Sequence, residues 1–461
     1  MKDLTTGGEA RAIVFFSLPM LLGNVFQQFY NMVDSIVVGN FVGKAALAAV
    51  GACFPVMFLM VALIMGVTMG TTVLVAQYFG AKDYHGVRAA VNTSYLILLV
   101  SGVVLSVAGV PAAPLIVRML GVPPDAAPLA RTYLAILFSG TLATFGYNSV
   151  SAILRGMGDS KTPLYILIVS TLMNAGLDLL FVVAFRMGVA GVALATVIAQ
   201  AVSFAGAMLV LDSRNRFVRF SLRELKFDGR MFSRTMKIGL PTGIQQTMVA
   251  SGHMVIMRIV NGFGTDVTAG FTAAMRLDSF AMMPAMNLSQ ALSAFTGQNI
   301  GAGRIDRVAR GFRAGLLIGL AISTVVGLAV ILFGRDLVTV FNRDPAVVSV
   351  GERYLLVAGT FYTIFTIMFV TNGVIRGAGE AMVPLFTTLL ALWIVRVPCA
   401  AWFSSFMGPD GVWWAMPAGW TVGCTATVLY YASGRWKRSR LAGPPPAGGV
   451  VGLEGEMEAV Q

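Results

Sequence analysis

Residues 76–81 read AQYFGA, and residues 297–302 read GQNIGA, 221 positions later. Both stretches follow long apolar runs, and three further matches keep the same order at nearly the same offset. These matches pair SLP at 17–19 with GLP at 239–241, ILRGMG at 153–158 with VIRGAG at 374–379, and GVAGV at 188–192 with GPDGV at 408–412. Four ordered matches at offsets of 220 to 222 indicate an internal duplication that covers most of the chain.

Each repeat is built from apolar runs long enough to cross a bilayer. The 461-residue chain is 57% hydrophobic and only 12% charged, with a mean hydropathy of +0.78, whereas soluble domains carry about 25% charged residues. Runs of about 18 or more apolar residues are typical of transmembrane helices. We expect twelve spans, at 12–38, 46–75, 90–117, 130–153, 162–185, 188–211, 238–262, 268–296, 311–333, 346–372, 382–404 and 410–433.

Six of these spans fall in each repeat. The predicted fold is therefore an all-α integral membrane protein with twelve transmembrane helices in two pseudo-symmetric six-helix bundles. An even number of crossings gives both bundles the same orientation and places a substrate site between them. We divide the chain into an N-terminal bundle at 1–211, a basic cytoplasmic linker at 212–237, a C-terminal bundle at 238–438 and a disordered tail at 439–461. The linker reads either as an amphipathic segment on the inner leaflet or as a solvated connector.

The net charge of +12 is arranged as a membrane protein requires. With both termini in the cytoplasm, roughly two-thirds of the 33 lysines and arginines fall in cytoplasmic segments, as the positive-inside rule demands. The basic charge thus orients the chain in a bacterial inner (plasma) membrane. We therefore do not interpret it as a nucleic-acid-binding surface. The first apolar run is too long and too polar for a cleaved signal peptide. The three cysteines lie within spans, at spacings that suggest neither a disulfide framework nor a metal centre, and we expect no cofactor.

Two acids lie inside the apolar spans of the first repeat, Asp34 and Asp178. An ionised carboxylate at bilayer depth costs about 2.5–3.5 kcal/mol, so such a residue is by default a site for a cation or proton on a transport path. Asn174 precedes Asp178 by one helical turn and shares its face. Carboxylate, amide and hydroxyl oxygens suit sodium, and two neighbouring acids equally suit a shared proton; the residues leave both open. Because Ile256 stands at the position equivalent to Asp34, we expect the cation site in the first bundle only.

Other polar and adaptable side chains within the spans are candidates for the wall of a substrate cavity. We assign to it Gln27, Asn31, Tyr147, Gln200, Gln246, His253, Met257 and Met283. Interhelical hydrogen bonding accounts equally for the amides, and ordinary packing for the methionines. Of the arginines within spans, Arg276 reads as snorkelling to the outer surface, and Arg396 could pair with a carboxylate or line the cavity.

At these motifs the chain resembles the multidrug and toxic compound extrusion (MATE) family over roughly residues 8–438. The resemblance implies two six-helix bundles around a V-shaped cavity and efflux of cationic or amphipathic compounds against sodium or proton entry. The chain is most similar to the DinF-like branch, in which the first-helix acid is joined by an Asn-x-x-x-Asp pair, here Asn174 and Asp178. The resemblance adds Thr196 and Asn148 to the cation site. It departs from the NorM-like branch, whose helix-seven glutamate is replaced here by Val249.

The predicted function is a secondary active antiporter that exports organic compounds in exchange for sodium or protons. Its partners are a small organic substrate and the lipid bilayer, and we expect a monomer. The alternative is a flippase for a lipid-linked saccharide or peptidoglycan precursor, in which Arg258, Arg276 and Arg396 would meet a pyrophosphate. An enzyme is disfavoured because the chain has no phosphate loop, no HExxH and no GxSxG motif. A structural scaffold would not need Asp34.

Overall fold

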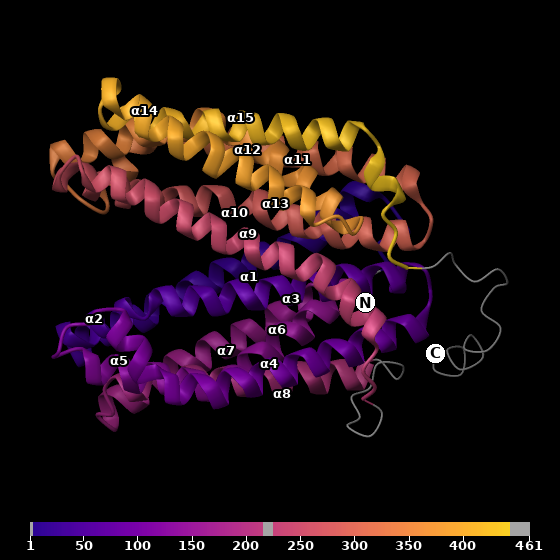
Figure 1. Cartoon of the computed structure of the whole chain (residues 1–461), viewed down its shortest axis with the longest axis horizontal. Coiled ribbons are helices and arrows are strands. Elements are labelled where there is room, and N and C mark those ends of the chain that lie inside the picture. Colours follow the sequence, from indigo (N-terminus) through magenta and orange to yellow (C-terminus); the bar gives the residue numbers. More distant parts are fainter. Residues whose placement is uncertain (1–2, 215–224, 443–461) are drawn as a thin grey trace.

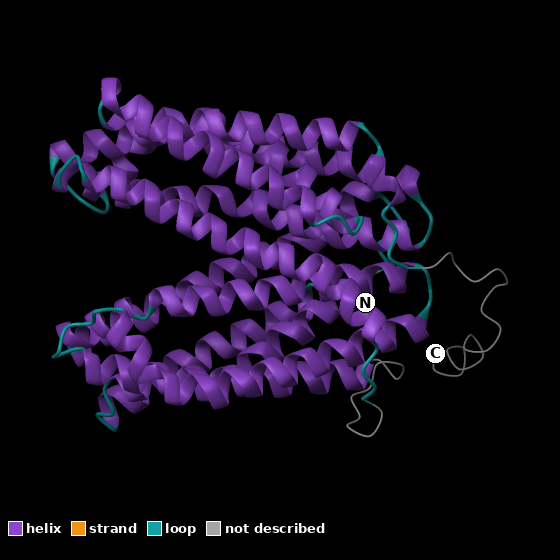
Figure 2. Ribbon diagram, viewed as in Figure 1, coloured by secondary structure: helices purple, strands orange, loops and turns teal. Residues whose placement is uncertain are grey.

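The computed structural model describes residues 3–214 and 225–442, except for the side chains of Asn31, Ser35 and Arg214. Within these residues the chain is helical, and the helices form two lobes (Figures 1 and 2). Eight helices of the described residues are long and apolar enough to cross a membrane. Each of the twelve predicted spans overlaps described helices, several of which extend beyond the predicted bounds.

The N-lobe consists of α1 to α8. Its helices are α1 (Glu9–Val37), α2 (Lys44–Ala52), α3 (Phe54–Gly80), α4 (Tyr84–Met119), α5 (Ala127–Ser139), α6 (Thr141–Gly156), α7 (Lys161–Leu179) and α8 (Val189–Arg214). Single π-helical turns extend α1 over Val38–Val42 and α7 over Leu180–Ala184. Two predicted spans are each broken into two helices, one at Cys53 and one at Gly140. At the first break, the proline in the first turn of α3 lacks the N–H that would continue α2.

The C-lobe repeats this plan with α9 to α15. Its helices are α9 (Gly229–Asn261), α10 (Thr265–Gly301), α11 (Ile305–Thr339), α12 (Pro345–Gly377), α13 (Met382–Thr388), α14 (Val397–Met407) and α15 (Pro409–Ala432). A π-helical segment, Leu389–Arg396, joins α13 to α14, and a short 3₁₀ turn, Arg435–Arg438, follows α15. Asp228 caps α9 by accepting from the backbone N–H of Arg230 and Met231, which satisfies orphan donors at the helix start.

The predicted linker and tail are both shorter in the structure. α8 continues to Arg214 and α9 begins at Gly229, so the predicted linker 212–237 is helical at its two ends; residues 215–224 lie outside the described residues. The tail was expected to be disordered from 439 onward, but Leu441 and Ala442 are buried and hydrogen-bonded. Composition alone did not reveal this, because the acceptor, Gln77, is supplied by a distant helix.

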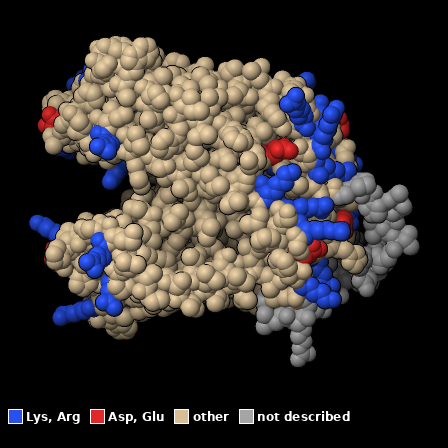
Figure 3. Space-filling model, viewed as in Figure 1, with Lys and Arg blue, Asp and Glu red and all other residues tan. Residues whose placement is uncertain are grey.

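The two lobes meet at the end of the molecule that carries the termini and separate toward the other end (Figure 1). In the space-filling view this separation is a hollow open on the side away from the termini (Figure 3). Lysine and arginine side chains gather around the terminal end (Figure 3). At the contact, a Cβ built on Gly70 of α3 would overlap the carbonyl oxygen of Thr235 in α9, so only glycine lets these two backbones approach so closely.

Candidate functional site

The two membrane-embedded acids of the N-lobe meet. Asp34 lies near the end of α1 and is half-buried, while Asp178 lies near the end of α7 and is fully buried. The side-chain amide of Asn174, one turn before Asp178, faces both acids; with its nitrogen assigned to that side, it donates to Asp34 Oδ1 at 3.0 Å and to Asp178 Oδ2 at 3.3 Å. The two bonded oxygens are therefore no more than about 6 Å apart. Three residues predicted for one cation site thus form one cluster.

We call Asp34, Asp178 and Asn174 the acid cluster. Asp178 Oδ1 is buried without a hydrogen-bond partner in the described residues, and so is Gln200 Oε1 on α8, the helix packed against α7. Thr196 lies one turn before Gln200 on α8 and adjoins Tyr30. Buried polar atoms are normally paired, so the unpaired oxygen within the acid cluster fits a site that holds a cation or a proton.

Two tyrosines beside the acids were missed by sequence reasoning. Tyr30 of α1 and Tyr133 of α5 are near enough to interact electrostatically with both Asp34 and Asp178. The spacing of Tyr30, one helical turn before Asp34, was a usable signal. No comparable signal existed for Tyr133, because its approach to the acids depends on how α5 packs.

Two other predicted residues are not joined to the acid cluster by any described hydrogen bond. The Asn148 amide donates to the Thr144 carbonyl of its own helix at 2.8 Å. Tyr147 was assigned to the substrate cavity, but its side chain is buried in the N-lobe core and its hydroxyl donates to the Pro163 carbonyl at 3.0 Å. The structure thus places Tyr147 in packing rather than on a cavity wall. The side chain of Asn31 lies outside the described structure.

The remaining cavity candidates differ in exposure. Gln27 on α1 and Met257 on α9 are half-buried, His253 on α9 is exposed, and Met283 on α10 is buried. Gln246 of α9 donates to the Met65 sulfur of α3 at 3.2 Å and so bridges the lobes. Gln27 lies on α1, and Gln246, His253 and Met257 lie on α9. Across the contact between the lobes, α1 packs against α10 and α9 packs against α3.

The C-lobe contains a buried acid of its own. Asp278 of α10 accepts hydrogen bonds from Tyr354 at 3.0 Å and Tyr362 at 2.7 Å, both on α12. Arg396, at the end of the π-helical segment, is near enough to interact electrostatically with Asp278. Arg276, two positions earlier on α10, is exposed and lines a surface groove of about 620 Å³. Arg276 and Asp278 therefore point to different surroundings, as their spacing predicts, and Arg396 lies beside a carboxylate.

The two buried acid clusters differ chemically. In the N-lobe two carboxylates share one amide, and two unit charges no more than about 6 Å apart repel by at least about 3 kcal/mol in a medium of effective dielectric ~20. A cation or a single proton between them removes that repulsion. In the C-lobe one carboxylate already accepts from two hydroxyls and has a guanidinium nearby. Only the N-lobe acid cluster is short of positive charge.

Comparisons with known proteins agree with this architecture. The MatE family profile matches residues 19–180 and again residues 241–402, two stretches of equal length. A Bacillus subtilis protein named "Probable multidrug resistance protein YpnP" is 34% identical over 95% of this chain and 98% of its own. A crystal structure of MATE in the bent conformation superposes with a TM-score of 0.89 at 25% identity, covering 95% of this chain and 98% of that one. An outward-facing multidrug resistance MATE family transporter of the MOP superfamily superposes with a TM-score of 0.87, also at 25% identity, covering 96% and 98%.

Proposed function

Because the chain belongs to the multidrug and toxic compound extrusion (MATE) family of membrane transporters, we propose that it is an antiporter that exports cationic or amphipathic organic compounds. The exchanged ion is sodium or a proton, and it binds at the acid cluster of Asp34, Asp178 and Asn174. The observation that carries this proposal is the shared amide between two carboxylates inside an apolar bundle. A pair of acids short of positive charge is a site that a cation or proton can enter and leave.

The shape of the molecule supports alternating access. The hollow between the lobes opens away from the termini (Figure 3). With both termini in the cytoplasm of a bacterium, as the basic charge at that end favours, this is the outward-open state. A substrate carried out from the cytoplasm would leave the protein through this hollow.

Ion binding is coupled to helix position because the two acids lie on different helices. Asp34 is on α1, which faces the inter-lobe hollow, and Asp178 is on α7 behind it. An empty site pushes the two carboxylates apart, whereas an occupied site draws α1 and α7 together. Ion binding therefore moves α1 and, with it, Gln27, which we assigned to the wall of the substrate cavity. This movement links ion binding to release of the substrate.

The driving force is sufficient for strong accumulation. Moving one charge inward releases about 2.3 kcal/mol at 100 mV, and 1.4 kcal/mol corresponds to a tenfold ratio. One net charge per cycle therefore supports a gradient of roughly 50-fold. We assign the chain to the DinF-like branch and expect it to act as a monomer in the bacterial plasma membrane.

The test is transport by the purified protein in liposomes. We expect it to move a fluorescent cationic dye when a sodium or proton gradient is imposed, with one ion more effective than the other. A fluorescent lipid linked through a pyrophosphate serves as the comparison substrate. Movement of that lipid with no dye transport in either gradient would replace antiport with lipid flipping.

A further inference from the structure

Two buried glutamines from the repeated sequence motif join the two lobes. Gln77, near the end of α3 in the N-lobe, is fully buried, and its amide nitrogen donates to the Gly377 carbonyl of the C-lobe at 3.0 Å. Its oxygen accepts from the backbone N–H of Leu441 at 2.8 Å and of Ala442 at 3.3 Å. Leu441 follows the last helix of the C-lobe, so both functions of the amide bind the opposite lobe.

Gln298, near the end of α10 in the C-lobe, makes the mirror set of bonds. It is also fully buried, its nitrogen donates to the Gly156 carbonyl of the N-lobe at 2.9 Å, and its oxygen accepts from the Leu4 N–H at 3.0 Å. Leu4 precedes the first helix of the N-lobe. Each glutamine therefore binds a helix end and a chain terminus of the other lobe. We call the contacts of Gln77 and Gln298 the glutamine latch.

Glycines in the same motif allow the latch to close. A Cβ built on Gly80 would overlap the Gln298 carbonyl oxygen, and a Cβ built on Gly301 would overlap the Gln77 carbonyl oxygen. The backbones of α3 and α10 are thus in direct contact, one turn beyond the glutamines. The Gln-x-x-Gly motif therefore has one structural role. Its glutamine side chain bonds to the other lobe, and its glycine lacks the side chain that would keep the two helices apart.

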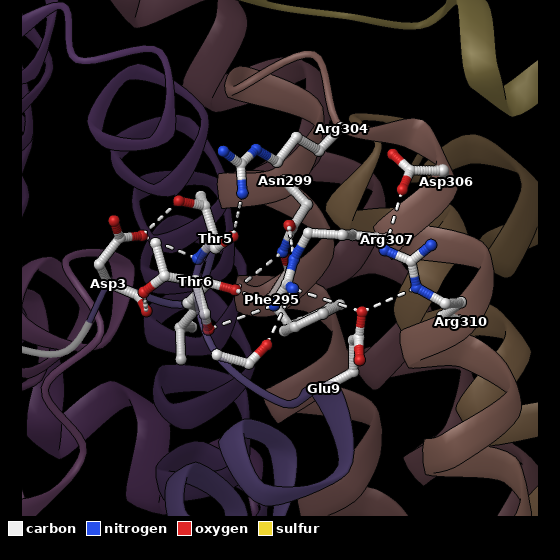
Figure 4. Close-up of polar contacts among 12 residues, drawn as sticks. Asp3, Thr5, Thr6, Glu9, Phe295, Asn299, Arg304, Asp306, Arg307 and Arg310 are labelled. Carbon is white, nitrogen blue, oxygen red and sulfur yellow. Dashed lines mark hydrogen bonds and ion pairs between the residues drawn. The ribbon is translucent and has the colours of Figure 1, made fainter.

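The segment Asp3–Gly7 is fastened to the C-lobe by several additional bonds, although it belongs in sequence to the N-lobe. Asn299 donates to the Leu4 carbonyl at 3.2 Å, Arg304 to the Thr5 carbonyl at 2.7 Å, and Arg307 to the Gly7 carbonyl at 2.9 Å (Figure 4). Glu9, at the start of α1, pairs with Arg310 at 2.9 Å (Figure 4). The segment Asp3–Gly7 therefore lies against the C-lobe at the end where the two lobes meet, and its Leu4 contacts Gln298.

From this geometry we propose that Gln77 and Gln298 are positioning residues that set the balance between the state open away from the termini and the state open toward them. The inference rests on the alternating access of the proposed function. If the lobes part at the terminal end, the bonds from Gln77 to Gly377 and from Gln298 to Gly156 must break, because each joins a helix of one lobe to a helix of the other. The bonds to Leu441, Ala442 and Leu4 hold the same two amides in place. Contacts made in only one of two states shift the population toward that state.

The test measures the two states directly, without substrate or ion. In a background in which Cys53, Cys399 and Cys424 are replaced, one pair of spin labels at Lys161 and Ser433 reports the separation of the lobes at the terminal end. A second pair, at Asp125 and Arg343, reports the far end. All four label positions are exposed. Distance distributions from double electron–electron resonance give the populations of both states in detergent or nanodiscs.

We expect Gln77→Ala and Gln298→Ala each to raise the population that is open at the terminal end by about fivefold to thirtyfold, the range that corresponds to the loss of one or two net hydrogen-bond energies. Gln245→Ala is the matched control: Gln245 is also buried, but its partners, Pro384, Thr388 and Arg376, all belong to its own lobe. This control is expected to lower thermal stability without changing the ratio of states.

Deletion of residues 2–6 provides a variant that keeps both glutamines. It removes Leu4, a buried residue whose N–H is the partner of the Gln298 oxygen, and should shift the populations in the same direction. Unchanged populations in the deletion and in the folded glutamine variants would overturn the proposal, as would an equal shift in Gln245→Ala. Because the distances are read without transport, failure of ion-coupled export would leave this result standing, and the reverse also holds.

Discussion

Replacing Asp34 with asparagine tests the acid cluster most directly, because it removes one charge and preserves the size of the side chain. A cation held about 3 Å from a carboxylate is attracted by about 5.5 kcal/mol at an effective dielectric of ~20. Loss of Asp34 removes that attraction, whereas the repulsion between the acids acts in both the empty and the occupied site and does not enter the binding free energy. A loss of up to about 5.5 kcal/mol corresponds to cation binding weaker by up to about 10,000-fold.

The assay is dye transport in liposomes at an imposed potential of 100 mV, in parallel with direct measurement of ion binding. The wild type is expected to approach the roughly 50-fold gradient that one charge supports. Asp34→Asn is expected to equilibrate the dye with no ion-driven accumulation. The matched control is Asp336→Asn, the same chemical change at an exposed acid of α11, which should leave accumulation intact. Full ion-driven accumulation by folded Asp34→Asn would refute the assignment of the acid cluster as the coupling site.

Three further predictions follow from buried polar atoms and close helix contacts. Gln200→Leu removes a buried oxygen that has no described partner; apparent ion affinity should fall about tenfold while thermal stability without ion rises, since an unpaired buried acceptor costs about 1–3 kcal/mol, and unchanged affinity would exclude Gln200 as a ligand. Asp278→Asn should destabilise the C-lobe by about 1–3 kcal/mol, because the buried hydroxyls of Tyr354 and Tyr362 lose their charged acceptor, yet folded protein should keep ion-driven export; loss of coupling would place a second ion site there. Gly70→Ala should cost about 1–3 kcal/mol through overlap with α9, whereas Gly206→Ala, which meets open space, should be neutral or stabilising in thermal denaturation.

Prediction from sequence succeeded where the information was local or repeated. The duplication and the apolar runs predicted the spans that the structure contains, and the spacing of Asn174 and Asp178 placed them correctly on one face. Prediction failed at boundaries set by single contacts. The capping of α9 by Asp228 and the docking of Leu441 on Gln77 shortened the linker and the tail, and neither contact follows from composition.

The importance of Asp278 was also missed, although it met the same criterion as Asp34. The structure buries it beside Tyr354 and Tyr362 of another helix. The two tyrosines are eight positions apart and so lie on one face of α12. That pattern was visible, but which helix it faces was not.

The sequence by itself determined the class of protein, the number of spans, their duplication and the presence of acids at bilayer depth, because hydropathy and helical periodicity act over a few residues at a time. Only the tertiary structure decided that Asp34 and Asp178 share one amide, that Asp278 is already neutralised by its neighbours, and that each motif glutamine binds the opposite lobe. These relations join residues more than seventy positions apart, and a duplicated sequence permits an amide to bond within its own repeat or across to the other. Helix packing at the glycine contacts selects the crossing, because there the two lobes approach closely enough for a side chain to reach a backbone partner.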